Sequence, residues 1–189
     1  MQHNMQTFLL QRFGKKSIEL LLAQESLLDK YVSSIRNKSA SQRKTMIKTI
    51  LPRVALYKAL QKNGFSPEES KGIVKDYMHF QLASMLKMLK WVDRYIPFSF
   101  SLLQKIGSRS SKKDNWRIEN VQQGKRRFSF DVIDCLWYNT CIENDCAELC
   151  SAFCNNDIYL YGNLVNTAFV RTQTLAAGGK LCDFIYEKN

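Results

Sequence analysis

Residues 116–135, WRIENVQQGKRRFSFDVIDC, decide the fold class, because apolar side chains begin to alternate there. Phe128, Phe130 and Val132 occupy every second position, which is typical of a strand with one buried face. Gly124 divides the stretch at a point where a turn fits. The stretch therefore predicts two antiparallel strands joined near Gly124.

The chain before this stretch has the period of helices. In residues 15–39, apolar side chains recur mostly every three or four positions and form one stripe along a helix. A basic amphipathic helix follows, and Pro52 breaks it, kinks it or begins the next helix. Ser66 and Glu69 then have the spacing of a capping box, which predicts a further helix extending to about Asp93.

Three segments complete the predicted arrangement. The polar segment 107–115 is expected to be a surface loop. Residues 143–157 are expected to form a short helix, and residues 168–187 a closing hairpin. The Gly178–Gly179 pair would form the tight turn of that hairpin.

The chain has 189 residues, 45% of them apolar, which is enough for the core of one compact domain. The prediction divides it into a helical region at 1–106, the loop at 107–115 and an antiparallel sheet with short helices at 116–189. This is an α+β fold with N-terminal helices packed on a C-terminal antiparallel β-sheet.

Cellular location is predicted from segments that the sequence lacks. The longest apolar runs are too short to span a bilayer, and the first residues do not have the pattern of a signal peptide. The six cysteines are irregularly spaced, which does not suit a disulfide framework. We therefore expect a cytoplasmic protein with reduced thiols and no membrane insertion.

The net charge of +11 is concentrated in the helical part of the chain. Residues 1–113 carry 21 Lys and Arg against 7 Asp and Glu, whereas residues 114–189 carry 7 against 10. Such a basic half suits nucleic acid, an acidic membrane surface or anionic ligands. The basic residues are spread over several helices as on solvated faces, so no nucleic-acid partner is expected.

Cys146, Cys150 and Cys154 are spaced by four, so a helix would place all three thiols on one face. This spacing matches no common zinc pattern. Cysteine is among the most buried residue types, and a stripe in the core is the simpler interpretation.

Cys135, Cys154 and Cys182 each lie within three residues of an aspartate. If the fold brings them together, thiols, carboxylates and Arg171 could share one pocket, and the cation would lower the pKa of a nucleophilic thiol. The same three thiols with Asp157 could instead hold zinc, the one cofactor that these residues would suit. No cofactor is otherwise expected.

Strand alternation limits what the closing hairpin can contribute to such a pocket. Cys182, Phe184 and Tyr186 should point to one face, and Asp183 to the other. Cys182 and Asp183 therefore cannot both face one pocket without a bulge. Arg171 and Asp183 could alternatively form a structural ion pair across the hairpin.

Four segments carry a resemblance to a known family: LPRVALYKALQKNGFSPEES, FSFDVIDC, AELCSAFCNND and, most specifically, RTQTLAAGGKLCDF. The sequence resembles the L-2-amino-thiazoline-4-carboxylic acid hydrolase family over most of its length. The matching positions are Cys135, Glu148, Cys154, Asp157, Arg171, Thr174, Gly178, Gly179, Cys182, Asp183 and Phe184.

The resemblance implies a hydrolase that opens a small, carboxylate-bearing cyclic isothiourea to an N-carbamoyl-cysteine-type product. Arg171, with Thr174 beside it, would bind the substrate carboxylate. Asp157, or its rival Glu148, would bind the N–H groups of the isothiourea. The residues implied are Cys154, Asp157 and Cys182 as catalytic, and Arg171, Thr174, Cys135, Glu148 and Asp183 as substrate-binding.

Two questions stay open at the level of sequence. The nucleophile is either water activated by the carboxylate or, as the preferred alternative, the thiolate of Cys154 or Cys182. The scaffold could also be a non-catalytic small-molecule-binding or sensor domain. The Gly-x2-Cys-x-Phe ending favours that alternative, since it is similar to the ending of vinyl-reductase-type binding domains.

Overall fold

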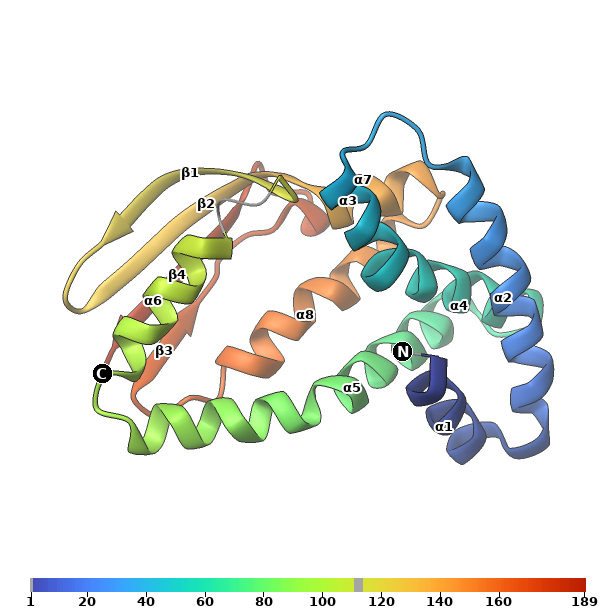
Figure 1. Ribbon diagram of the computed structural model, residues 1–189, viewed down its shortest axis with the longest axis horizontal. Helices are drawn as coiled ribbons and strands as arrows, with labels where there is room; N and C mark the ends of the chain where they lie inside the picture. Colours follow the sequence, from blue (N-terminus) through green and yellow to red (C-terminus); the bar gives the residue numbers. More distant parts are fainter. Residues whose placement is uncertain (1, 111–113) are drawn as a thin grey trace.

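The computed structural model of the protein describes residues 2–110 and 114–189. It confirms the α+β fold, with a helical half on one side and the sheet on the other (Figure 1). The helices are α1 (Gln2–Phe13), α2 (Ser17–Ser34), α3 (Ala40–Thr45), α4 (Leu51–Lys62), α5 (Pro67–Tyr95), α6 (Ser99–Ser110), α7 (Leu136–Glu143) and α8 (Cys150–Tyr161). The strands are β1 (Trp116–Gln123), β2 (Arg127–Cys135), β3 (Thr167–Val170) and β4 (Cys182–Lys188).

The four strands form one antiparallel sheet in the order β1-β2-β4-β3. β2 and β4 are the central pair, and residues opposite each other share a face. The pairs on the face toward the helices are Val132 with Cys182, Phe130 with Phe184, and Phe128 with Tyr186. This register confirms the predicted alternation of Cys182, Phe184 and Tyr186.

The helical half has its core where α2 packs against α4. Leu20 of α2 and Val54, Leu56 and Leu60 of α4 are all completely buried there. Pro52 is the second residue of α4 and lies in its first turn, where a missing N–H is tolerated. A π-helical turn, Met46–Ile50, precedes it and joins α3 to α4.

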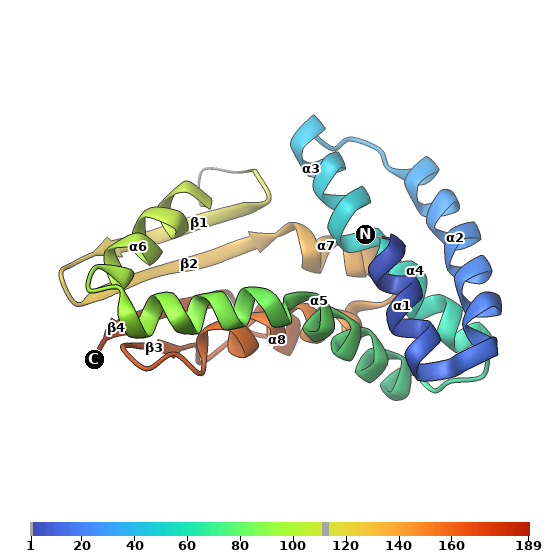
Figure 2. The same cartoon turned by 60° about the horizontal axis from the view of Figure 1, so that its bottom comes forward.

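Helix α5 extends from the helical half to the sheet (Figures 1 and 2). It begins with the predicted capping box: the Ser66 side chain accepts the Glu69 N–H, and the Glu69 carboxylate accepts the Ser66 N–H. The carboxylate satisfies an amide that the first turn of a helix leaves without a partner.

The last turn of α5 is bound to the sheet through one carboxylate. Asp93 is buried and accepts hydrogen bonds from the Val165 N–H (2.6 Å), the Asn166 N–H (2.8 Å) and the Thr167 hydroxyl (2.9 Å). These donors lie at the start of β3, so Asp93 fixes the distance between α5 and the edge of the sheet.

Helix α6 lies over the sheet (Figure 2). Its Phe100 packs with Phe128 and Tyr186 in a buried aromatic cluster. Gly107 approaches so closely that a Cβ atom there would lie 2.5 Å from the Phe128 ring. The predicted loop at 107–115 is therefore wrong at its start, because α6 continues to Ser110; residues 111–113 lie outside the described residues.

The closing hairpin differs from the prediction of a tight turn at the Gly pair. β3 ends at Val170 and β4 begins at Cys182, with a 3-10 turn (Leu175–Ala177) between them. Gly178 ends that turn in the left-handed region at φ 81°, and Gly179 brings its backbone against the Thr174 carbonyl. The glycines shape a loop, because the strands stop pairing before they reach it.

The predicted helix at 143–157 begins later than expected. A 3-10 turn, Ala147–Leu149, precedes α8, which begins at Cys150. Cys146 therefore lies outside the helix and does not share a helical face with Cys150 and Cys154. Within the described ranges, no helix is long and apolar enough to cross a membrane.

Candidate functional site

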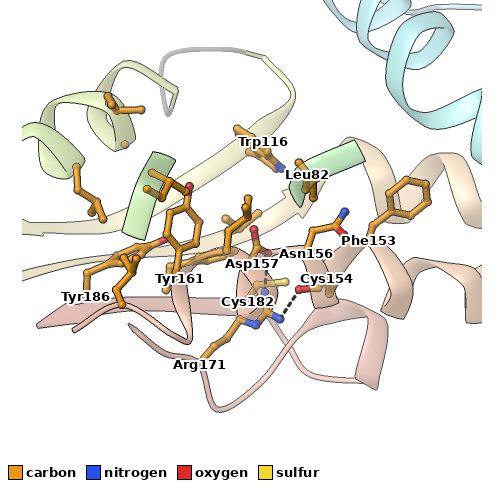
Figure 3. Close-up of a pocket in the computed structure, with 18 of the residues that line it drawn as sticks. Leu82, Trp116, Phe153, Cys154, Asn156, Asp157, Tyr161, Arg171, Cys182 and Tyr186 are labelled. Carbon is orange, nitrogen blue, oxygen red and sulfur yellow. Dashed lines mark hydrogen bonds and ion pairs between the residues drawn. The ribbon is translucent and has the colours of Figure 1, made fainter. Parts of the chain in front are cut away.

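A cavity of about 730 Å³ lies between α5, α6, α8 and the sheet (Figure 3). Most of its surface is apolar. The aromatic side chains that line it are Trp116, Phe128, Phe130, Trp137, Phe153, Tyr161, Phe184 and Tyr186. Cavities of about 300–1,000 Å³ hold small organic ligands, and a few polar groups orient the ligand within them. The polar groups of this cavity therefore locate the candidate site.

The central polar feature is an ion pair between α8 and the segment after β3. Arg171 donates to the Asp157 carboxylate through Nη1 (2.8 Å) and to the Cys154 carbonyl through Nη2 (2.8 Å). The Arg171 side chain is 5% exposed and that of Asp157 32%. The arginine is thus buried behind the carboxylate, and the carboxylate faces the cavity.

Local sequence places both partners. Cys150, Cys154 and Asp157 are spaced by four and three along α8, so they lie on the side of the helix that faces the cavity. Arg171 is the first residue after β3, and its guanidinium lies over the rings of Phe169 (5.8 Å) and Phe184 (5.4 Å). These rings hold the guanidinium in place by cation–π attraction.

The environment of Asp157 changes its acid–base behaviour. Burial raises the pKa of this carboxyl to about 6, although the Arg171 cation and its hydrogen bond oppose the rise. Arg171 occupies Oδ2, and among the described residues no donor reaches Oδ1. Asp157 is thus a carboxylate with one open oxygen and a pKa near neutrality, which suits a general base.

The three candidate thiols also face the cavity. A nucleophilic thiol needs a lowered pKa, but the pKa of each of these thiols is raised. A hydrogen bond with the Cys150 thiol, together with burial, raises the pKa of Cys154 despite the nearby Arg171. Burial raises the pKa of Cys135 to about 11 and also raises that of Cys182. All three are therefore neutral thiols at physiological pH.

The structure brings five of the predicted site residues to one cavity. They are Cys135, Cys154, Asp157, Arg171 and Cys182. The other three, Glu148, Thr174 and Asp183, lie outside the cavity lining, and each has a structural partner. The exposed Glu148 accepts the Tyr57 hydroxyl, and the Thr174 side chain accepts the Ala177 N–H.

Asp183 holds the loop that follows β3. It accepts the N–H and hydroxyl of Thr172 and the N–H of Gln173. Burial alone would raise the pKa of Asp183, but these hydrogen bonds outweigh it and hold the pKa below its usual value. The suggested Arg171–Asp183 ion pair is wrong, since Arg171 pairs with Asp157.

The cavity contains a second cation that the sequence reasoning missed. Arg53 of α4 is 8% exposed and lines the cavity. Its guanidinium donates to the Lys48 carbonyl (3.0 Å) and to Gln81 Oε1 (2.5 Å), and burial lowers its pKa. The sequence does contain an indication that Arg53 is buried, because it lies within the apolar stretch LPRVAL. In the structure every residue of that stretch is buried.

The zinc alternative has no geometric support. Among the residues that the structure describes, no group of three or more His, Cys, Asp or Glu side chains is placed to hold a metal ion. The candidate site therefore consists of an ion pair, neutral thiols and a buried arginine around an apolar cavity.

This fold and site define an α+β protein with a mostly apolar cavity between its helices and its sheet. A sequence model of the L-2-amino-thiazoline-4-carboxylic acid hydrolase family matches residues 42–186, and the chain belongs to that family. No curated protein matches significantly. A crystal structure of an H-NOX protein from S. oneidensis, a triple mutant in the Fe(II) ligation state, aligns with 99% of this chain and 93% of its own at 12% identity. Its TM-score of 0.36 is too low to support any inference.

Proposed function

We propose that the protein hydrolyses a small cyclic isothiourea that carries a carboxylate, of the L-2-amino-thiazoline-4-carboxylic acid type. Family membership supports a hydrolase of this kind. The observation that carries the proposal is the Asp157 carboxylate, which faces an apolar cavity with one open oxygen and a pKa of about 6.

The reaction needs one base. Asp157 Oδ1 accepts a proton from a water molecule as the water oxygen attacks the carbon between the ring sulfur and the nitrogens. The carbon–sulfur bond then breaks, and Asp157 returns its proton to the departing sulfur, which becomes the thiol of the product. The proton left on the added hydroxyl moves to the former ring nitrogen, so that the carbon becomes the urea carbonyl of the product. Arg171 holds Asp157 in position through Oδ2, so the geometry of the base is fixed before the substrate binds.

Water is the better nucleophile of the two alternatives. A thiolate would require Cys154 or Cys182 to lose a proton near neutral pH, and the pKa of each is raised. As neutral thiols, Cys154 and Cys182 would instead pack against the ring sulfur of the substrate as small, polarisable side chains. We therefore propose water as the nucleophile, in place of the cysteine thiolate that the sequence favoured.

Arg53 is the better cation for the substrate carboxylate. Asp157 already holds the Arg171 guanidinium. Arg53 lines the same cavity from α4, and its buried guanidinium is oriented by hydrogen bonds to the Lys48 carbonyl and to Gln81 Oε1. A buried guanidinium gains most from an anion, because the surroundings compete weakly for it. The substrate would then lie with its carboxylate toward α4 and its ring toward α8.

The direct test is turnover. Purified protein is incubated with L-2-amino-thiazoline-4-carboxylic acid, and N-carbamoyl-cysteine is measured by mass spectrometry against a heat-denatured control. Product formation above that control is expected. No product at any pH between 5 and 9 would reject the proposal.

The rate should depend on pH through Asp157. A general base works only when deprotonated, so kcat/KM should rise with pH through about 6 and level off above it. A thiolate nucleophile would instead give a rate that still climbs at alkaline pH, because the pKa of each thiol is raised. The pH profile of kcat/KM thus separates the two mechanisms.

Arg53→Met should remove the preference for a carboxylate. The substrate and its methyl ester are compared, and the acid-to-ester ratio of kcat/KM should fall by about tenfold or more, the effect of one charge-assisted hydrogen bond. Arg53→Lys, which keeps the charge, should retain part of the ratio. An unchanged ratio in Arg53→Met would assign the carboxylate to another group.

A second candidate function is non-catalytic binding of a small apolar molecule. It is favoured by the volume of the cavity, about 730 Å³, and by its aromatic lining, since an aminothiazoline ring fills only part of such a space. Binding without turnover would appear as a ligand-dependent rise in thermal stability while the substrate remains intact.

A further inference from the structure

The outer surface of α5 carries an exposed apolar stripe. We define it by Met85, Met88, Trp91 and Tyr95, which recur every three or four residues on α5, together with Phe98 in the turn that follows the helix, and call it the α5 stripe. All but Met85 are more than half exposed. The centroids of the Trp91 and Tyr95 rings lie 6.0 Å apart. Soluble proteins rarely expose apolar side chains in such a contiguous row without a partner.

Basic residues flank the α5 stripe. Lys87, Lys90 and Arg94 are exposed on the same helix, and the Arg94 guanidinium lies over the Tyr95 ring. From residue 77 to residue 108 the only acidic residue in the sequence is Asp93, and its carboxylate is buried against the start of β3. By the helical period, all three basic residues lie on the same side of the stripe, next to Trp91. The surface is thus apolar along the stripe and positive along one edge of it.

The helix that follows the stripe also carries exposed apolar side chains. Leu102 and Ile106 of α6 line the cavity and are also exposed, so they form part of its rim. Phe98 connects the α5 stripe to α6 along the chain. Exposed apolar side chains thus occur on both α5 and the next helix, and those of α6 also belong to the cavity lining.

We propose that the α5 stripe docks the protein on an anionic membrane surface. Aromatic and methionine side chains enter the region between headgroups and acyl chains, while flanking Lys and Arg side chains pair with anionic headgroups. A second copy of the chain fits less well, because two such faces would bring like charges together. The inference stands independently of the proposed reaction, since docking needs no turnover.

The test is co-sedimentation with vesicles. Wild-type protein should bind phosphatidylcholine vesicles that contain phosphatidylserine, bind pure phosphatidylcholine vesicles weakly, and dissociate at high salt. The charge variant Lys87→Gln/Lys90→Gln/Arg94→Gln should weaken binding about a hundredfold at low salt. The apolar variant Met88→Ser/Trp91→Ser should weaken it at least about tenfold at any salt concentration.

A matched control uses equally exposed apolar residues on another helix. Ile18 and Leu22 of α2 are each 64% exposed, and Ile18→Ser/Leu22→Ser should bind vesicles as the wild type does. Three results would overturn the proposal: an apolar variant that binds normally, equal binding to neutral vesicles, or a concentration-dependent dimer that Met88→Ser/Trp91→Ser dissolves. The proposal would also be overturned if the protein bound duplex DNA through Lys87, Lys90 and Arg94 with no contribution from Met88 and Trp91.

Discussion

Asp157→Asn should lower kcat by about 10²- to 10⁴-fold, the usual contribution of a positioned general base. Asn keeps the shape of the side chain but cannot accept a proton from water. The residual rate should also lose its dependence on pH near 6, since the carboxyl that titrates there has been replaced by an amide. Initial rates of product formation, measured between pH 5 and 9, give both results.

The control for this prediction must separate lost chemistry from lost folding. Asp157→Asn leaves Arg171 buried without its counterion, so each variant is first checked by circular dichroism at the assay temperature. The double variant Asp157→Asn/Arg171→Met removes both charges and should fold well, yet remain inactive. If it retains wild-type turnover, Asp157 is not the base.

Stability should respond unequally to the loss of either partner of this ion pair. Asp157→Asn should lower the free energy of unfolding by about 3 kcal/mol, because Arg171 stays charged and is 5% exposed. Arg171→Met should cost clearly less, because Asp157 can take up a proton and is 32% exposed toward the cavity. Urea unfolding at pH 7 measures both values.

The double variant completes the cycle. Replacing a buried ion pair by neutral groups is often close to neutral in stability, so Asp157→Asn/Arg171→Met should be more stable than Asp157→Asn alone. Asp183→Asn is the matched control, because that carboxylate lies outside the cavity and binds only loop donors. Additive losses in the double variant would show that the two side chains are not coupled.

Local patterns predicted the parts of the fold that depend on local physics. The capping box at Ser66 and Glu69 follows from a spacing of three, and the cavity-facing row of Cys182, Phe184 and Tyr186 follows from strand alternation. The period change at residues 116–135 gave the α+β class for the same reason. Each of these inferences needs only neighbours in the chain.

The missed features depend on contacts between distant segments. Which carboxylate pairs with Arg171 is decided by the packing of α8 beside the sheet, so the choice between Asp157 and Asp183 could not be read from spacing. The burial of Arg53 depends on Gln81 in another helix. The Gly pair was misassigned because pairing between β3 and β4 stops at Val170, before the glycines.

Asp93 also has a consequence for how a ligand enters and leaves. If α5 moved away from β3, Asp93 would lose its hydrogen bonds to Val165, Asn166 and Thr167. Each of these charged hydrogen bonds is worth about 1.5–3 kcal/mol. The last turn of α5 is therefore held against β3, and this side of the cavity is expected to stay rigid. Motions that admit a ligand are therefore expected in α6, whose Leu102 and Ile106 line the cavity and are exposed to solvent, so the rate of ligand exchange should depend on the packing of that helix.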